Sequence, residues 1–438
     1  MTKTLQRFGH FFLFVPLLIL ILGLRHYAFS QNQTAGVRND STLNKGASLP
    51  EAKIKESLAG FQDSNVCSGG IPKYSKLCEA SNGKLYGLTC YGGQYNSGVL
   101  FEFNPSDKTG VIRVNFDTLA MGSNPYGSLM KASNNKLYGM TRSGGKYAFG
   151  VLFEYDPIQK VFRKLIDFKG VANGCCPHGG LIESSAGHLY GLTTRGGRYN
   201  SGVLFEYIIS ENSLNKLVDF KETESGSFPH GTLVEAADGK LYGMTKEGGK
   251  YGYGTLFEFN PATKTLSVKF DFDGSGSGCF PRGELVPYGD NLLYGLTASG
   301  GKNKFGVMFY YDIRKETFHK VLDFSDKQNG ICPLGSLLYA ETKQLYGMTY
   351  QGGENGFGVL FEYNPADQSY SKKVDFDGLN GKYPFGSLIQ ASNSKIYGMT
   401  QFGGASGGGV LFEYHPDTGM IEKIFDFRGY NYIPVSYE

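Results

Sequence analysis

The chain alternates short apolar runs with turns rich in glycine, proline, asparagine and aspartate, and its repeated part shows no helical period. The most regular phrase is Tyr-Gly-[Leu/Met]-Thr, which recurs at intervals of 52 residues, or 51 at the last step. Its tyrosines are Tyr86, Tyr138, Tyr190, Tyr242, Tyr294, Tyr346 and Tyr397. A fixed period of this length predicts an array of one supersecondary unit.

Each repeat predicts four short strands. The first follows a Pro-x-Gly entry (residues 179–183), and the second is built on Lys-Leu-Tyr-Gly-Met-Thr (residues 240–245). The third is Gly-Val-Leu-Phe-Glu-Tyr (residues 150–155), and the fourth ends on Asp-Phe. Asn-Gly or Asp-Gly favours a two-residue hairpin between the first two strands. Paired glycines permit positive φ angles before the third strand, and Asn-Pro or Asp-Pro marks the last turn.

The strands are apolar on both faces, as Val-Leu-Phe shows, which is typical of sheets packed on either side. A closed ring of such sheets buries both faces and leaves few free edges. We therefore predict an all-β fold, a seven-bladed β-propeller with four antiparallel strands per blade; a right-handed β-helix is the alternative. The expected blades are residues 74–117, 126–169, 178–221, 230–273, 282–325, 334–377 and 385–428. Either residues 61–66 or the tail 430–438 should latch the ring, and Asp63, on the register of the repeated aspartate, favours the former.

The N-terminus has the layout of a cleavable signal peptide, with Lys3 and Arg7 before an apolar run and small residues ahead of Gln31. We expect residues 1–30 to be removed on export, to the extracellular space or the periplasm. Residues 31–58 are polar and aperiodic, which predicts a flexible linker, and residues 59–438 form the propeller. An uncleaved anchor is the alternative, and only that alternative makes the membrane a partner.

Charge and cysteine content narrow the partners. Loss of the leader leaves basic and acidic residues equal in number and without a basic run, so we expect no nucleic-acid partner. The seven cysteines of an exported chain can form disulfides, and the odd number leaves at least one unpaired in the monomer that we expect. No C-x-x-C pair is present, which argues against a zinc ribbon.

The phrase Leu-Tyr-Gly-Met-Thr-x-x-Gly-Gly-x-x-x-x-Gly-x-Leu-Phe-Glu-Phe (residues 241–259) resembles the GloVer tandem repeat of exported bacterial proteins, and the resemblance covers all seven units. More distantly the paired glycine and Phe-Glu-Tyr-Asn-Pro resemble kelch repeats, although the tryptophan usual in kelch blades is absent. The resemblance implies a kelch-like propeller and export. It implies no known activity.

No signature of a metalloprotease, a serine hydrolase or a phosphate-binding loop occurs in the sequence. One strand position holds glutamate in six repeats, and the Asp-Phe aspartate recurs similarly, so we interpret both as structural. These glutamates are Glu102, Glu154, Glu206, Glu258, Glu362 and Glu413. The runs Asp271-x-Asp273-Gly274 and Asp375-x-Asp377-Gly378 resemble calcium loops only loosely. We therefore predict no catalytic residue, no cofactor and no metal site.

Positions that vary inside the constant frame are the best candidates for binding. The middle residue of Pro-x-Gly should lie near the mouth of the central channel, and these seven residues form a predicted ligand-binding ring. They are Tyr74, Tyr126, His178, His230, Arg282, Leu334 and Phe385. A second predicted surface, a loop rim of tyrosines beside cations, follows the paired glycines and suits sugars or acidic polymers. Its residues are Tyr95, Tyr147, Arg198, Tyr199, Lys250 and Tyr251.

These patterns favour a non-catalytic extracytoplasmic binding module that recognises a polysaccharide or a protein ligand on its loop rim. A carbohydrate-active hydrolase or lyase with its site at the channel mouth is one alternative, because aromatic, imidazole and guanidinium groups gather there. A structural surface or envelope protein is the other. The simpler interpretation of the ring is that its residues pack under neighbouring loops, and that of the loop rim is the ordinary polarity of exposed loops.

Overall fold

The computed structural model describes residues 66–67, 69–325 and 327–428. All of them belong to the unit Lys55–Glu438, which is described by itself. The predicted leader (1–30) and linker (31–58), Asp63 and the tail 430–438 lie outside the described residues. Within the described ranges, no helix is long and apolar enough to cross a membrane.

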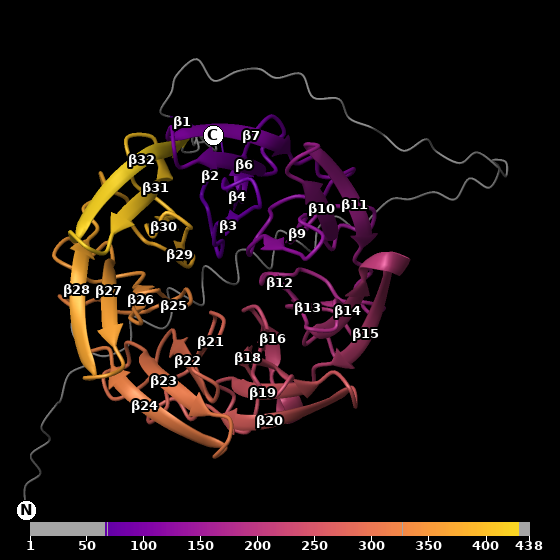
Figure 1. The fold of residues 1–438 in the computed structure, drawn as a ribbon. Coiled ribbons are helices and arrows are strands. Elements are labelled where there is room, and N and C mark those ends of the chain that lie inside the picture. The colour runs from indigo at the N-terminus through magenta and orange to yellow at the C-terminus, as the bar shows by residue number, and fades with distance from the viewer. Residues whose placement is uncertain (1–65, 68, 326, 429–438) are drawn as a thin grey trace, which may run out of the picture. The chain divides into compact units, whose positions relative to one another are not determined.

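Seven antiparallel sheets form a ring of blades, with the short first strands toward the centre and the long fourth strands at the outer edge (Figure 1). The first two blades are β3 (Cys78–Glu79), β4 (Leu85–Thr89), β6 (Val99–Asn104) and β7 (Thr109–Asn115), then β8 (Met130–Lys131), β9 (Leu137–Thr141), β10 (Val151–Asp156) and β11 (Val161–Asp167). The next two are β12 (Leu181–Glu183), β13 (Leu189–Thr193), β14 (Val203–Ile208) and β15 (Ser213–Asp219), then β17 (Val234–Glu235), β18 (Leu241–Glu247), β19 (Thr255–Asn260) and β20 (Thr265–Asp271).

The last three blades follow the same order. They are β21 (Val286–Tyr288), β22 (Leu292–Thr297), β23 (Val307–Asp312) and β24 (Thr317–Asp323), then β25 (Leu338–Tyr339), β26 (Leu345–Met348), β27 (Val359–Asn364) and β28 (Ser369–Asp375), and finally β29 (Ile389–Gln390), β30 (Ile396–Met399), β31 (Gly407–His415) and β32 (Met420–Arg428). The fourth blade gains an extra pairing of β16 (Ser227–Pro229) with β18. The short helices η1 (Ile209–Glu211) and α2 (Glu222–Ser225) are loop elements. The predicted seven-bladed propeller is confirmed.

The core lies between neighbouring blades. Tyr138 of the second blade packs in one cluster with Leu189 and Phe205 of the third, and all of β9 is buried. Gly139 pairs with Phe153 across the sheet, and a Cβ at this glycine would lie 2.5 Å from the phenylalanine ring. The glycine of the Tyr-Gly phrase therefore makes room for the aromatic residue of the third strand. This steric need explains why both residues recur in every repeat.

The last blade meets the first at two places. Strand β1 (Val66–Cys67) runs parallel to β32, and β2 (Gly69–Gly70) pairs with β5 (Tyr91–Gly92) of the first blade. At the axis, a Cβ on Gly386 would lie 2.1 Å from the carbonyl oxygen of Ser75. The other Pro-x-Gly glycines approach the next blade equally closely, for example Gly179 toward Gly231. Only a residue without a side chain fits there, so the inner strands begin in a tight ring.

Candidate functional site

The seven residues of the predicted ligand-binding ring converge on the propeller axis. Tyr74 is central: its ring centroid lies 4.3 Å from Phe385, 5.3 Å from His178 and 5.6 Å from Tyr126. Arg282 donates a hydrogen bond from Nη1 to Tyr74 Oη at 3.0 Å. The sequence placed these residues near one another correctly, and the contacts now show how they are arranged.

The ring residues fill the axis instead of lining an open channel. The buried members are Tyr126, His178, His230 and Phe385. Leu334 completes the wall of an axial cavity of only about 30 Å³. Along the same axis, Lys76 of the first blade forms an ion pair with Glu284 of the fifth, with Nζ and Oε1 2.5 Å apart. The residues expected at a channel mouth thus close the axis, and a polymer does not pass through it.

The two buried histidines form a hydrogen-bonded chain with a fixed direction. Arg142 donates from Nε to His178 Nε2 at 2.9 Å, and the two Nδ1 atoms of His178 and His230 lie 3.1 Å apart. Burial lowers the pKa of both imidazoles well below the usual range, and nearby cations, preceded at His230 by His178, add to the effect, so both are neutral near pH 7. His178 must therefore carry its proton on Nδ1 and donate it to His230, which leaves the proton of His230 on Nε2.

A larger cavity, of about 180 Å³, lies against these histidines, and we call it the cationic pocket. Its lining residues are Arg142, Cys176, His178, Thr194, Arg195, Phe228, His230, Lys246 and Glu247. Three basic side chains therefore face one carboxylate, and that carboxylate, Glu247, is ion-paired with Lys246. The Arg195 guanidinium lies 4.8 Å from the centroid of the Phe228 ring, which holds it in place. Positive charge and hydrogen-bond donors dominate the wall.

The basic residues of this pocket were not predicted from the sequence, although a signal for them exists. Arg142 and Lys246 each follow the threonine of Tyr-Gly-x-Thr, and Thr194 holds the same position between them. The residue after this threonine varies between repeats although the phrase before it is constant, just as the middle residue of Pro-x-Gly varies. Treating this variable position as a candidate for binding would have identified Arg142 and Lys246, two of the three basic residues of the pocket.

The predicted loop rim is exposed and uneven around the ring. Its four tyrosines, which we call the tyrosine arc, are 40–52% exposed. They are Tyr95, Tyr147, Tyr199 and Tyr251, of the first four blades. Blades five to seven carry Asn303, Asn355 and Ser406 at that position. Arg198 lies 5.5 Å from the Tyr199 ring centroid and Lys250 lies 4.9 Å from that of Tyr251, so aromatic faces and cations alternate on one side of the rim.

Each rim loop is held by glycines and by the side chain before the phenylalanine of the fourth strand, which is an aspartate in six blades and Asn115 in the first. In the second blade, Gly144 and Gly145 have φ angles of 76° and 75°, and a Cβ on Gly145 would lie 2.5 Å from Asp167 Oδ1. That oxygen accepts the backbone N–H of Lys146 at 2.7 Å, and the equivalent bond occurs between Arg198 and Asp219. The repeated aspartates therefore fix loops that carry the rim residues.

The repeated glutamates are also structural. In the second blade, Glu154 accepts hydrogen bonds from Tyr138 Oη at 2.8 Å and from Lys136 Nζ at 2.6 Å. In the first blade, burial alone would raise the pKa of Glu102, but hydrogen bonds from Arg113, Lys84 and Tyr86 lower it to about 2. Such an ionised, fully partnered carboxylate is a poor proton donor and a poor nucleophile.

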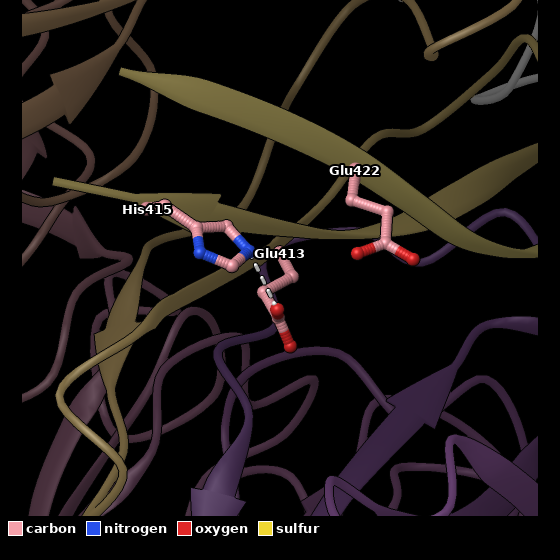
Figure 2. A group of neighbouring side chains, drawn as sticks. All are labelled: Glu413, His415 and Glu422. Carbon is pink, nitrogen blue, oxygen red and sulfur yellow. Dashed lines mark ion pairs between the residues drawn. The ribbon is translucent and has the colours of Figure 1, made fainter. Parts of the chain in front are cut away.

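Among the described residues, one group of acidic and histidine side chains is compact enough for a metal ion, Glu413, His415 and Glu422 on β31 and β32 (Figure 2). Glu413 already pairs with His415 Nε2 at 2.8 Å and with Lys395 Nζ at 2.6 Å, and Glu422 pairs with Lys108. Protein cations thus hold these carboxylates, and we assign no metal to them.

The two calcium-like runs form turns. Asp273 Oδ1 accepts the backbone N–H groups of Gly276 and Ser277 at 2.8 Å each, and Asp377 Oδ1 accepts those of Leu379 and Asn380 at 2.8 Å. The oxygens that would bind calcium cap their own loops, which is the usual role of aspartate at such positions.

Solved structures share the fold with this chain at low identity. The extracellular domain of a protein named as a hybrid two-component system from B. thetaiotaomicron has a TM-score of 0.55 and 14% identity, over 80% of this chain and 40% of that one. A protein named as a 6-phosphogluconolactonase from Bacteroides uniformis scores 0.54 at 14% identity, over 77% and 93%. The periplasmic gluconolactonase of Pseudomonas aeruginosa scores 0.50 at 15% identity, over 81% and 94%. At such identities the likeness establishes the propeller alone.

Sequence comparison is more specific. No curated protein matches this chain significantly. The Gloeobacter/Verrucomicrobia repeat matches residues 72–292 and again residues 277–436, which together span the whole ring of blades. The expected resemblance to the GloVer repeat is therefore confirmed, and the chain belongs to the Gloeobacter/Verrucomicrobia repeat family.

Proposed function

We propose that this protein is an exported, non-catalytic binding module for an acidic polysaccharide. One observation carries the proposal: in each of blades two to four, the segment at the end of the second strand and in the loop after it contributes to both surfaces. Each supplies a cation or a hydroxyl to the cationic pocket and a tyrosine to the arc, as Arg142 and Tyr147 do in the second blade. A chain of sugars with an anionic group fits this pairing, because aromatic faces contact sugar rings and cations contact the charge.

The charge of the pocket selects the ligand class. A carboxylate or sulfate that enters it meets Arg142, Arg195 and Lys246, while Glu247 is held by Lys246. Hydrogen bonds between charged groups contribute roughly 1.5–3 kcal/mol each. The neutral His230 adds a donor without adding repulsion among the cations. A neutral sugar gains none of the binding free energy that depends on charge, so the pocket favours acidic sugars.

The arrangement of acids and bases favours binding over catalysis. A retaining glycosidase needs two carboxyl groups about 5 Å apart and an inverting one a wider pair, whereas Glu247 is the one carboxylate among the lining residues. An eliminating lyase needs a free base. The lone pairs of His178 and His230 accept hydrogen bonds from Arg142 and from His178, so neither imidazole is free to take a proton.

The proposal is tested by titrating the purified protein with acidic oligosaccharides (oligogalacturonate, a sulfated glycan) and a neutral glucan, with and without calcium. We expect binding of an acidic glycan that weakens with salt, and weak or no binding of the neutral one. The double substitution Arg142→Gln, Lys246→Gln should lower the affinity by at least about 100-fold, since two charged contacts are lost. Calcium should have no effect.

Lys302→Gln is the matched control, because it removes a rim cation of the fifth blade outside the pocket and the arc. It should leave affinity unchanged. Equal affinity for neutral and acidic glycans, or an unaffected double variant, would overturn the proposal. Turnover of the glycan, seen as new reducing ends or as unsaturated products, would favour the hydrolase or lyase alternative. Absence of any glycan binding would favour a protein ligand or a structural role.

A further inference from the structure

The cationic pocket contains a feature that its role in glycan binding does not require, a pair of adjacent cysteines. Cys175 and Cys176 lie in the loop between β11 and β12, and their Sγ atoms are 3.3 Å apart. Cys175 is buried and Cys176, which lines the pocket, is partly exposed. All six cysteines whose side chains the structure describes are free thiols, so this pair stands reduced.

Backbone hydrogen bonds fix the loop at both cysteines. Cys175 exchanges two hydrogen bonds with Arg195, N–H to carbonyl at 2.8 Å and 3.1 Å, and the N–H of Cys176 bonds to Phe149 at 2.9 Å. Cys176 has a φ angle of 58°, and the residue before proline has a similar φ in the other blades, for example 57° at Cys332. The loop therefore has a fixed backbone at both cysteines, and their Sγ atoms lie 3.3 Å apart on it.

The surroundings activate the exposed sulfur. The hydrogen bond between the two thiols lowers the pKa of Cys176, burial opposes this effect, and the guanidinium groups of Arg142 and Arg195 lower the pKa further. The same contact and burial raise the pKa of Cys175. A thiolate beside cations at a partly exposed position is the reactive form of cysteine.

We propose that Cys175 and Cys176 form a thiol–disulfide exchange site that opens into the cationic pocket and prefers anionic disulfides. Cys176 attacks one sulfur of the incoming disulfide, whose other sulfur leaves as a thiolate and takes a proton. Cys175 then gives up its proton and attacks Cys176 in the mixed disulfide, which releases the second thiol. The two protein thiols are oxidised to one disulfide while one external disulfide is reduced to two thiols.

The bond formed should be reversible. Adjacent residues have Cα atoms 3.8 Å apart across a trans peptide, which is shorter than the 4.4–6.8 Å usual for a disulfide. A disulfide under such strain is more easily reduced, and labile disulfides of this kind are the regulatory or catalytic ones. The site therefore exchanges with its partner and does not serve as a permanent cross-link.

The chain supplies its own controls for the experiment. Cys279 occupies in the fifth blade the position of Cys175, and Cys332 occupies in the sixth blade the position of Cys176, each without a cysteine beside it. Burial raises the pKa of Cys332. The variants Cys175→Ser and Cys176→Phe carry residues that the fourth blade holds at these positions, Ser227 and Phe228, so the loop should still fold.

The test treats the reduced protein with oxidised glutathione, which is anionic, or with cystamine, which is cationic, and follows each cysteine by mass spectrometry. We expect the Cys175–Cys176 disulfide to form at least about 10-fold faster than Cys332 is modified, and glutathione disulfide to react faster than cystamine. Cys175→Ser should accumulate glutathione at Cys176, and Cys176→Phe should leave Cys175 unmodified.

Equal rates at Cys332 and Cys176, or a Cys175→Ser protein that gains no glutathione at Cys176, would overturn the inference. A preference for cystamine would overturn the part that concerns charge. The inference rests on the thiols and their cations and not on the glycan. A protein that binds no glycan but oxidises at this pair would therefore contradict the proposed function and support the exchange site.

Discussion

The middle strands of the blades and the axis of the propeller are built from one repeat, yet they use their side chains differently. On the strands, a tyrosine donates to a glutamate in six blades, at 2.6–3.0 Å. At the axis, the six Pro-x-Gly positions and the equivalent Tyr74 hold five residue types. The tyrosine faces the glutamate across the same two strands in each of these six blades, so one solution serves all six. The axis is one small volume shared by seven residues, which must differ to fill it.

The need to fill the axis explains why its side chains differ from blade to blade. Seven identical large side chains pointing at one axis would clash, so close packing there requires a mixture of sizes. Tyr74, for example, receives both the edge of Phe385 and a hydrogen bond from Arg282. The same break in symmetry leaves cations on one side of the axis, at Arg142 and Lys246. The cationic pocket is therefore asymmetric although the fold repeats seven times.

The largest expected effect is a loss of stability when a repeated glutamate on the strands is removed. Glu102→Ala leaves Arg113, whose side chain is 7% exposed, as a buried charge without its carboxylate. Breaking a buried pair in this way costs about 3–5 kcal/mol of unfolding free energy. Urea denaturation followed by circular dichroism measures the loss. Glycan affinity of the folded variant should be unchanged, since Glu102 lies in the first blade and does not line the cationic pocket.

Glu154→Ala in the second blade is the matched control. Its arginine partner, Arg163, is 61% exposed and 3.8 Å away, so water replaces the lost carboxylate. This variant should lose less than half as much stability as Glu102→Ala. Equal losses would mean that the glutamates act mainly through their tyrosines and that the buried arginine adds nothing.

The difference between repeated and varied positions also explains how far the sequence could be interpreted. The period and the turn residues predicted the seven blades, and Pro-x-Gly predicted that His178 and His230 lie at the axis. The closure of that axis was not predictable, because it depends on side chains from opposite blades, such as Lys76 and Glu284, which no local pattern pairs. The pocket was missed for a different reason: Arg142 follows an invariant phrase and was passed over with it.

The second prediction concerns pH. His178 and His230 have folded-state pKa values well below 6.5, so the unfolded chain binds their protons first and stability falls as pH falls through the unfolded pKa. From about pH 7 to about 5.5, the two groups should together remove about 2.5 kcal/mol of unfolding free energy. Denaturant titrations at these pH values measure this loss.

The double substitution His178→Gln, His230→Gln isolates the histidine contribution, because all carboxylates remain. The variant should be less stable at pH 7 but should lose much less stability on acidification than the natural protein. If both proteins lose the same amount, the histidines are protonated in the folded axis and the neutral hydrogen-bonded chain is wrong.

The third prediction tests the cation that lies on an aromatic ring. Arg195→Gln removes a charged donor from the pocket and should weaken binding of an acidic oligosaccharide about 30-fold, near 2 kcal/mol. The affinity should also depend less on salt. Ser299 holds the same place in the fifth blade, paired with Cys279 as Arg195 is with Cys175. Ser299→Gln should therefore leave affinity unchanged, and a loss there would show that the loops matter irrespective of charge.

The smallest expected effect tests whether the tyrosine arc contributes to glycan binding. Tyr199→Ala removes a 44% exposed ring that Arg198 and Lys221 flank, and should cost about 1 kcal/mol, or fivefold in affinity for a long acidic glycan. A short oligosaccharide that fills only the pocket should lose nothing. Asn303→Ala, at the same position of the fifth blade, should change neither affinity. Equal losses for short and long ligands would place Tyr199 in the pocket's support and not on the path of the polymer.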